Sequence, residues 1–143
     1  MRLNKASVAA ALAGLLVAVG LPLAGHWARQ RTEPLCTLDS VRIDPAYRIE
    51  VVDSEGRTHA FCCPLCAGTW LRRQPSPPRS ITVTDEASGE PIDAAKAYYV
   101  RNAVETTPVS GNRIHVFRHQ ADAERNAREH AGVVLLPSEN PFR

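Results

Sequence analysis

The sequence has 143 residues, of which 44% are hydrophobic and 22% are charged, and this composition argues against an intrinsically disordered chain. Four of the 17 basic residues and none of the 15 acidic residues lie in residues 1–31, which leaves 13 basic against 15 acidic residues in the remainder. Such a mildly acidic body lacks the basic patch that nucleic-acid binding requires, and this class of partner is excluded.

Residues 6–25 form an apolar segment, ASVAAALAGLLVAVGLPLAG, without a charged residue. Its 20 residues are about enough to span a bilayer, and Arg2 and Lys5 precede it as in a signal anchor. The alternatives are a cleaved signal peptide and a buried helix of a soluble protein. We expect a retained single-pass anchor in the inner membrane, with the body in the periplasm or otherwise outside the cytoplasm.

The first half of the body has the pattern of two strands, a helix and a third strand. Residues 47–52 and 57–62 predict a hairpin around the turn DSEG at 53–56. Residues 64–73, PLCAGTWLRR, predict a helix that begins at Pro64, and residues 80–85 predict the third strand.

The second half repeats this order. Strands are expected at 97–102 and 113–118 with a loop at 107–112 between them, a helix at 120–131 and a closing strand at 132–136. Residues 57–61, RTHAF, match residues 113–117, RIHVF, at an offset of 56, which suggests an internal duplication.

These patterns predict an α+β fold of tandem ββαβ modules behind an N-terminal transmembrane helix. Three segments follow: the anchor and the start of its tether at 1–31, a cysteine-containing metal-binding module at 32–85, and a second module without cysteines at 86–143.

All four cysteines, Cys36, Cys62, Cys63 and Cys66, lie in the first module. Thiolates with this spacing at a junction of strand and helix can converge on one metal ion, either tetrahedral Zn(II) or low-coordinate Cu(I). The first turn of the helix favours thiolate over thiol. Disulfides remain an alternative for an extracytoplasmic chain, as does thiol redox chemistry at the C-x2-C of residues 63–66.

Two further residues are candidate ligands. His59 lies three positions before Cys62, although its counterpart His115 in the copy without cysteines favours a packing role. Asp39 follows Cys36 by three positions and is a candidate oxygen ligand, which would favour zinc, although a turn aspartate ordinarily caps the backbone.

An enzyme is not expected from this sequence. It contains no recognisable Ser-His-Asp arrangement, phosphate loop or pair of poised carboxylates, and no small-molecule substrate is apparent.

The stretch FCCPLCAGTWL with the upstream CTLDSVRI resembles the treble-clef-like metal-sensing and trafficking fingers called TRASH or YHS domains. That resemblance implies Cys36, Cys62 and Cys66 as ligands, with Cys63 as an additional thiol.

Residues 36–136 are similar to the NosL family, the copper-delivery accessory proteins of nitrous oxide reductase assembly. The similarity rests on the segments IDAAKAYYV, TPVSG and VFRHQADAERNAREHAGVVLL. It implies a tandem ββαβ fold and Cu(I) delivery to a client metalloenzyme or assembly protein.

Where the family has C-G-M and tPMG, this chain has CTLDS and Val109, and Met1 is its only methionine. A Cu(I) site must therefore be built from thiolates, a ligand set that also suits Zn(II), and the client need not be nitrous oxide reductase. The rival functions are a zinc- or disulfide-stabilised interaction module and a thiol oxidoreductase.

Overall fold

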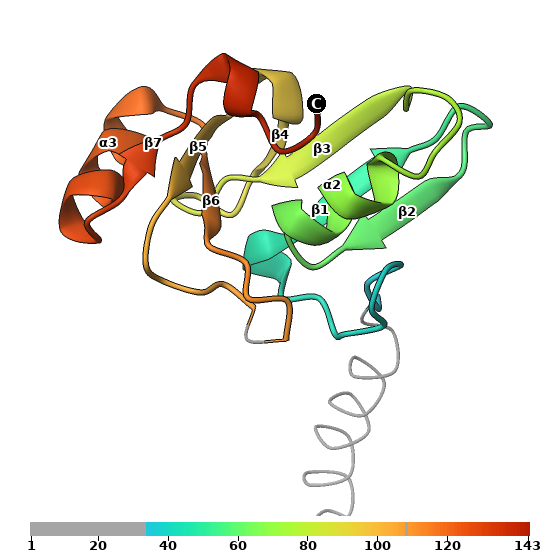
Figure 1. Cartoon of the computed structure of the whole chain (residues 1–143), viewed down its shortest axis with the longest axis horizontal. Helices are drawn as coiled ribbons and strands as arrows, with labels where there is room; N and C mark the ends of the chain where they lie inside the picture. Colours follow the sequence, from blue (N-terminus) through green and yellow to red (C-terminus); the bar gives the residue numbers. More distant parts are fainter. Residues whose placement is uncertain (1–33, 108) are drawn as a thin grey trace, which may run out of the picture. The chain divides into compact units, whose positions relative to one another are not determined.

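The computed structural model describes residues 34–107 and 109–143 of the chain (Figure 1). The anchor predicted at residues 6–25 lies outside these described residues. In the part that is described, no helix combines the length and the apolar character needed to cross a membrane.

The first sheet has four antiparallel strands in the order β2-β1-β3-β4. Its strands are β1 (Ile49–Val52), β2 (Thr58–Phe61), β3 (Ser80–Thr84) and β4 (Pro91–Asp93). Asp53 makes the turn between β1 and β2, because its Oδ1 accepts the backbone N–H groups of Glu55 and Arg57, both at 2.9 Å. Gly56 completes the turn with a φ of 88°, in the left-handed region that glycine tolerates. The predicted hairpin around 53–56 is therefore confirmed.

Helix α2 (Pro64–Leu71) follows β2 directly and packs against β1 and β2 (Figure 1). Cys63 is its N-cap, in an extended conformation, and Pro64 occupies the first turn as expected. The helix ends two residues earlier than predicted, because Arg73 and Gln74 donate to the carbonyls of Trp70 and Leu71 and tighten the last turn.

The second sheet has three antiparallel strands in the order β6-β5-β7, with one helix packed against all three. These elements are β5 (Tyr98–Arg101), β6 (Ile114–Phe117), α3 (Gln120–Glu129) and β7 (Val133–Val134). The order matches β2-β1-β3 of the first sheet, and β6 and α3 each begin 56 residues after β2 and α2. The order of two strands, a helix and a third strand is thus present in both halves.

Strands β4 and β7 depart most from the sequence prediction. Strand β4 was not expected. It is a short edge strand that begins at a proline, and it ends where Asp93 caps the 3-10 turn η2 (Ala94–Lys96). Strand β4 lies after residue 85, in the segment predicted to be the second module. It nevertheless pairs with β3 of the first sheet. Strand β7 has two residues rather than the five expected at 132–136, and the chain then turns into η3 (Pro137–Glu139). A further 3-10 turn, η1 (Pro45–Tyr47), precedes β1.

One hydrophobic core joins the two sheets. It combines Phe61 and Val51 of the first sheet with Tyr99 and Val116 of the second. All four cysteines belong to this same core. A smaller cluster under α3 holds the helix to its own sheet. The side chains of all four cysteines are therefore held by packing within this core.

Candidate metal centre

Cys36 lies in a tight reversal of the chain at residues 35–42, here called the knuckle, which is closed by a bridge between Leu35 and Arg42. Inside it, the Cys36 N–H donates to the Val41 carbonyl at 2.8 Å. Thr37 ties the knuckle to β2 by donating to the Ala60 carbonyl at 2.8 Å. The knuckle, the hairpin of β1 and β2, and helix α2 thus follow one another along the chain.

The other three cysteines lie where β2 passes into α2. Cys62 follows the last residue of the strand, Cys63 is the N-cap, and Cys66 lies in the first turn of the helix. A strand that runs directly into a helix turns the chain sharply at this point. The side chains of Cys62 and Cys66 consequently face the knuckle.

Four side chains meet between the knuckle and the helix: Cys36, Asp39, Cys62 and Cys66 each place one ligand atom within 4.8 Å of the others. The Sγ atoms of Cys62 and Cys66 are 3.6 Å apart. Asp39 Oδ2 lies 3.2 Å from Cys66 Sγ and 3.7 Å from Cys62 Sγ. The three cysteines are at most 3% exposed, whereas Asp39 is only partly buried. We call these four residues the metal group.

Asp39 uses its two oxygens differently. Oδ1 accepts the Val41 N–H at 3.1 Å, the capping role expected for a turn aspartate, while Oδ2 faces the thiols. Burial opposes ionisation, but hydrogen bonds from the Cys36 thiol, the Val41 N–H and the other two thiols outweigh it and hold the pKa of this carboxyl below its ordinary value. The metal group therefore contains a carboxylate anion.

Cys63 is fully buried but lies outside the metal group. Its Sγ is 3.8 Å from Cys62 Sγ, accepts the Cys66 N–H at 3.5 Å, and lies 3.3 Å from Ser110 Oγ. Hydrogen bonds from the Cys62 and Cys66 thiols lower the pKa of Cys63 to about 3, against the effect of burial. The hydrogen bond with Cys63 raises the pKa of the Cys62 thiol, and the hydrogen bond with Cys62 raises the pKa of the Cys66 thiol. Of these three neighbouring thiols, Cys63 is thus the one that ionises first.

His59 and its counterpart His115 make contacts outside the metal group. His59 Nε2 lies 2.9 Å from Asp53 Oδ2, and its ring packs on Trp70 with centroids 4.5 Å apart. His115 pairs through Nδ1 with Glu86 at 2.8 Å. Among the described residues, no histidine belongs to the metal group, and all four cysteines are free thiols.

Ser110 is the contact that sequence reasoning missed. It lies in the loop predicted at 107–112 of the second half, yet its hydroxyl touches Cys63 of the first half. Nothing in the spacing of the sequence signals this contact, because it depends on how the two sheets pack.

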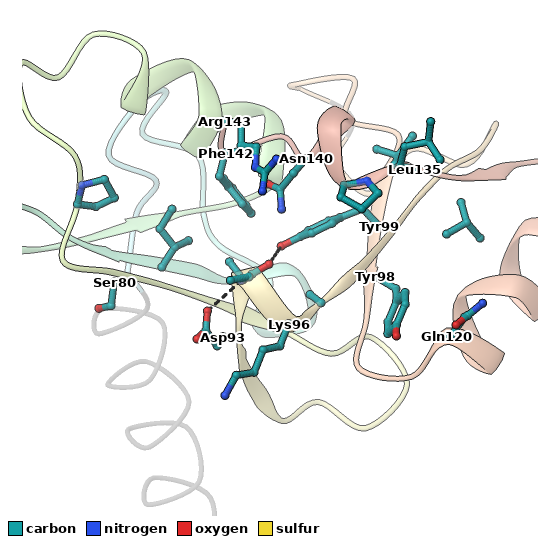
Figure 2. A pocket seen from close by; sticks show the side chains of 18 residues that line it. Ser80, Asp93, Lys96, Tyr98, Tyr99, Gln120, Leu135, Asn140, Phe142 and Arg143 are labelled. Atoms are coloured by element: carbon teal, nitrogen blue, oxygen red, sulfur yellow. Dashed lines mark hydrogen bonds between the residues drawn. The ribbon is translucent and has the colours of Figure 1, made fainter.

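A cavity of about 650 Å³ is lined by residues outside the metal group (Figure 2). Tyr99 crosses it and donates its O–H to the Ala94 carbonyl at 2.7 Å, while Asp93 caps the Ala95 N–H (Figure 2). The residues that line it include neither a cysteine nor a histidine. Within the described residues, the cysteines lie at the junction of knuckle and helix and not in this cavity.

Comparison with known proteins finds a fold match among solved structures. No protein-family model matches the sequence, and no curated protein matches it. Among solved structures, the crystal structure of the copper chaperone NosL from Shewanella denitrificans matches with a TM-score of 0.65 and 18% sequence identity. The match covers 74% of this chain and 88% of that one. At this identity the match establishes a fold shared with that copper chaperone.

Proposed function

We propose that this protein is a NosL-like Cu(I) chaperone that carries the ion at the metal group and passes it to a client metalloenzyme or assembly protein. The observation that carries the proposal is the convergence of three buried cysteine side chains from two separate segments on one point. The shared fold with a copper chaperone supports the same function.

The donor set suits Cu(I). Thiolate sulfur is the soft ligand that this ion prefers, and Cys36, Cys62 and Cys66 supply three such atoms. A thioether contribution is not available from the body of the protein, since Met1 is the only methionine.

Transfer is expected to proceed by ligand exchange. Cys62 and Cys66 stand on the rigid junction of strand and helix, whereas Cys36 stands on the knuckle. The sulfurs are buried, and Asp39 is the member of the group that reaches solvent, so a client approaches from the side of the knuckle. A client sulfur then adds to the ion before Cys36 releases it.

The proposed location is outside the cytoplasm, on a single-pass anchor in the inner membrane. Its support is the uncharged segment at residues 6–25 and the two basic residues before it. A tether of this kind would keep the metal group near the membrane surface where a client is assembled.

The test is a Cu(I) titration of the full-length protein, reduced and free of oxygen, against a calibrated competing chelator. We expect one tightly bound Cu(I) per chain. Cys36→Ser and Cys66→Ser should each lower the affinity at least about 100-fold, because each removes a ligand. Cys63→Ser is the matched control: it changes a buried cysteine of the same cluster but keeps an N-cap acceptor for Cys66.

Three results would contradict the proposal. The first is the absence of Cu(I) binding. The second is binding of Zn(II) whose removal unfolds the protein, which would indicate a structural zinc module. The third is turnover of a disulfide substrate that depends on Cys63, which would indicate a thiol oxidoreductase.

A further inference from the structure

Asp39 caps the knuckle with only one of its two carboxylate oxygens. Oδ1 accepts the Val41 N–H, and Oδ2 points at the sulfurs of Cys62 and Cys66. The capping role uses only Oδ1, so it does not account for the contacts of Oδ2 with two thiols. The second oxygen of Asp39 is placed as a ligand atom.

The separations of three of the ligand atoms match those of a four-coordinate ion. A tetrahedral Zn(II) with bonds of about 2.3 Å to sulfur and about 2.0 Å to oxygen requires sulfurs about 3.8 Å apart and an oxygen about 3.5 Å from each sulfur. The observed Sγ–Sγ separation of Cys62 and Cys66 is 3.6 Å, and Asp39 Oδ2 lies 3.2 Å and 3.7 Å from the two sulfurs. Cys36 Sγ lies within 4.8 Å of each of these atoms.

Zn(II) and Cu(I) use such a group differently. Zn(II) completes four-coordination and accepts carboxylate oxygen readily, whereas Cu(I) is satisfied by two or three soft sulfurs and gains little from a hard oxygen. The carboxylate therefore favours Zn(II) far more than it favours Cu(I).

We propose that Asp39 determines the metal selectivity of the site: it serves as the fourth ligand of Zn(II) and stays outside the coordination sphere of Cu(I). This inference rests on the proposed function, since it concerns the same metal group. The native site then binds either Cu(I) or Zn(II). Zn(II) holds the knuckle closed through Asp39 and Cys36 together, and Cu(I) leaves the carboxylate free.

Two substitutions separate a ligand role from a capping role. Asp39→Asn is nearly isosteric and keeps an oxygen that can cap the Val41 N–H, but it removes the anionic ligand. Asp44→Asn is the matched control, because Asp44 caps the Ala46 N–H at 3.0 Å by the same two-residue turn and is exposed outside the metal group.

The experiment measures Zn(II) and Cu(I) affinities of the full-length wild type and both variants by chelator competition under reducing, oxygen-free conditions. For Asp39→Asn we expect Zn(II) affinity to fall at least about 100-fold and Cu(I) affinity to fall less than about tenfold. Co(II) substituted for Zn(II) provides a spectroscopic signature, because its visible bands should change in Asp39→Asn and keep their wild-type positions in Asp44→Asn. Thermal unfolding of the metal-free variants checks that the fold is kept.

Equal losses for the two metals would overturn the inference, because they would mean that Asp39 acts by holding the knuckle. Unchanged Zn(II) affinity would overturn it as well. Neither result would affect the proposed Cu(I) chaperone. Conversely, a wild type that binds Zn(II) through Asp39 but never binds Cu(I) would refute the proposed function and leave the role of Asp39 intact.

Discussion

Gly68 is a close-packed position whose substitution has a calculable cost. It lies in the middle of α2, and a Cβ atom built on it would come within 2.3 Å of the Pro141 carbonyl oxygen in the C-terminal segment. Ordinary contact at this position begins at 3.4 Å, so Gly68→Ala must displace that segment by about 1.1 Å. The obstacle is a backbone carbonyl, which cannot rotate away as a flexible side chain would.

Two effects of opposite sign set the magnitude. Alanine is better than glycine in a helix interior by about 1 kcal/mol. Overpacking of this kind costs about 1–3 kcal/mol. We therefore expect a net loss of about 1 kcal/mol in the free energy of unfolding. For a body of this size, that corresponds to a fall in Tm of roughly 4 °C.

The assay is thermal unfolding followed by circular dichroism, with Thr69→Ala as the reference. Thr69 is the next residue of the same helix, and its hydroxyl takes part in a surface hydrogen bond with Arg72. Thr69→Ala gains helix propensity without meeting the C-terminal segment and should leave Tm unchanged or slightly raised. If Gly68→Ala were more stable than wild type, the contact between α2 and the C-terminal segment would be refuted.

Two further predictions concern pH and the core. Burial lowers the pKa of His115, but Glu86 and the Val104 carbonyl, which accept from its two ring nitrogens, outweigh it and raise the pKa. The stability from this pair is complete below the unfolded-state value near 6.5 and is lost as pH rises through the higher folded-state value. The free energy of unfolding should therefore decline above about pH 6.5, and Glu86→Gln should reduce that decline; an equally steep decline in the variant would contradict the assignment. Phe61 is fully buried, so Phe61→Ala should lower the free energy of unfolding by about 3–5 kcal/mol in urea titrations. A loss below about 1 kcal/mol would show that the core is not packed around this ring.

The sequence predicted those features that depend on local pattern. The turn at Asp53, the start of α2 at Pro64 and the offset of 56 residues between β2 and β6 all follow from residues that are neighbours in the chain. Strand β4 escaped prediction because three residues beginning with a proline carry too little periodicity to indicate a strand.

The sequence indicated which types of ligand the candidate site contains, but not which of the candidate residues come together. Cysteine spacing placed Cys62 and Cys66 together, whereas the choice between Asp39 and His59 depended on tertiary packing. His59 contacts Asp53 and Trp70 instead of the thiols, whereas the knuckle places Asp39 next to Cys66. The contact of Ser110 with Cys63 joins the two sheets, and no local pattern encodes it.

The central claim is that the metal group carries an exchangeable Cu(I) ion rather than a structural metal. The most direct test loads the full-length protein with one Cu(I), removes the ion with a stronger chelator, and follows copper and near-UV circular dichroism in the same sample. We expect complete removal and reloading with the folded spectrum retained, because the hydrophobic core holds the cysteines in place without metal. Loss of the folded spectrum as copper leaves, or failure to bind Cu(I) at all, would contradict it.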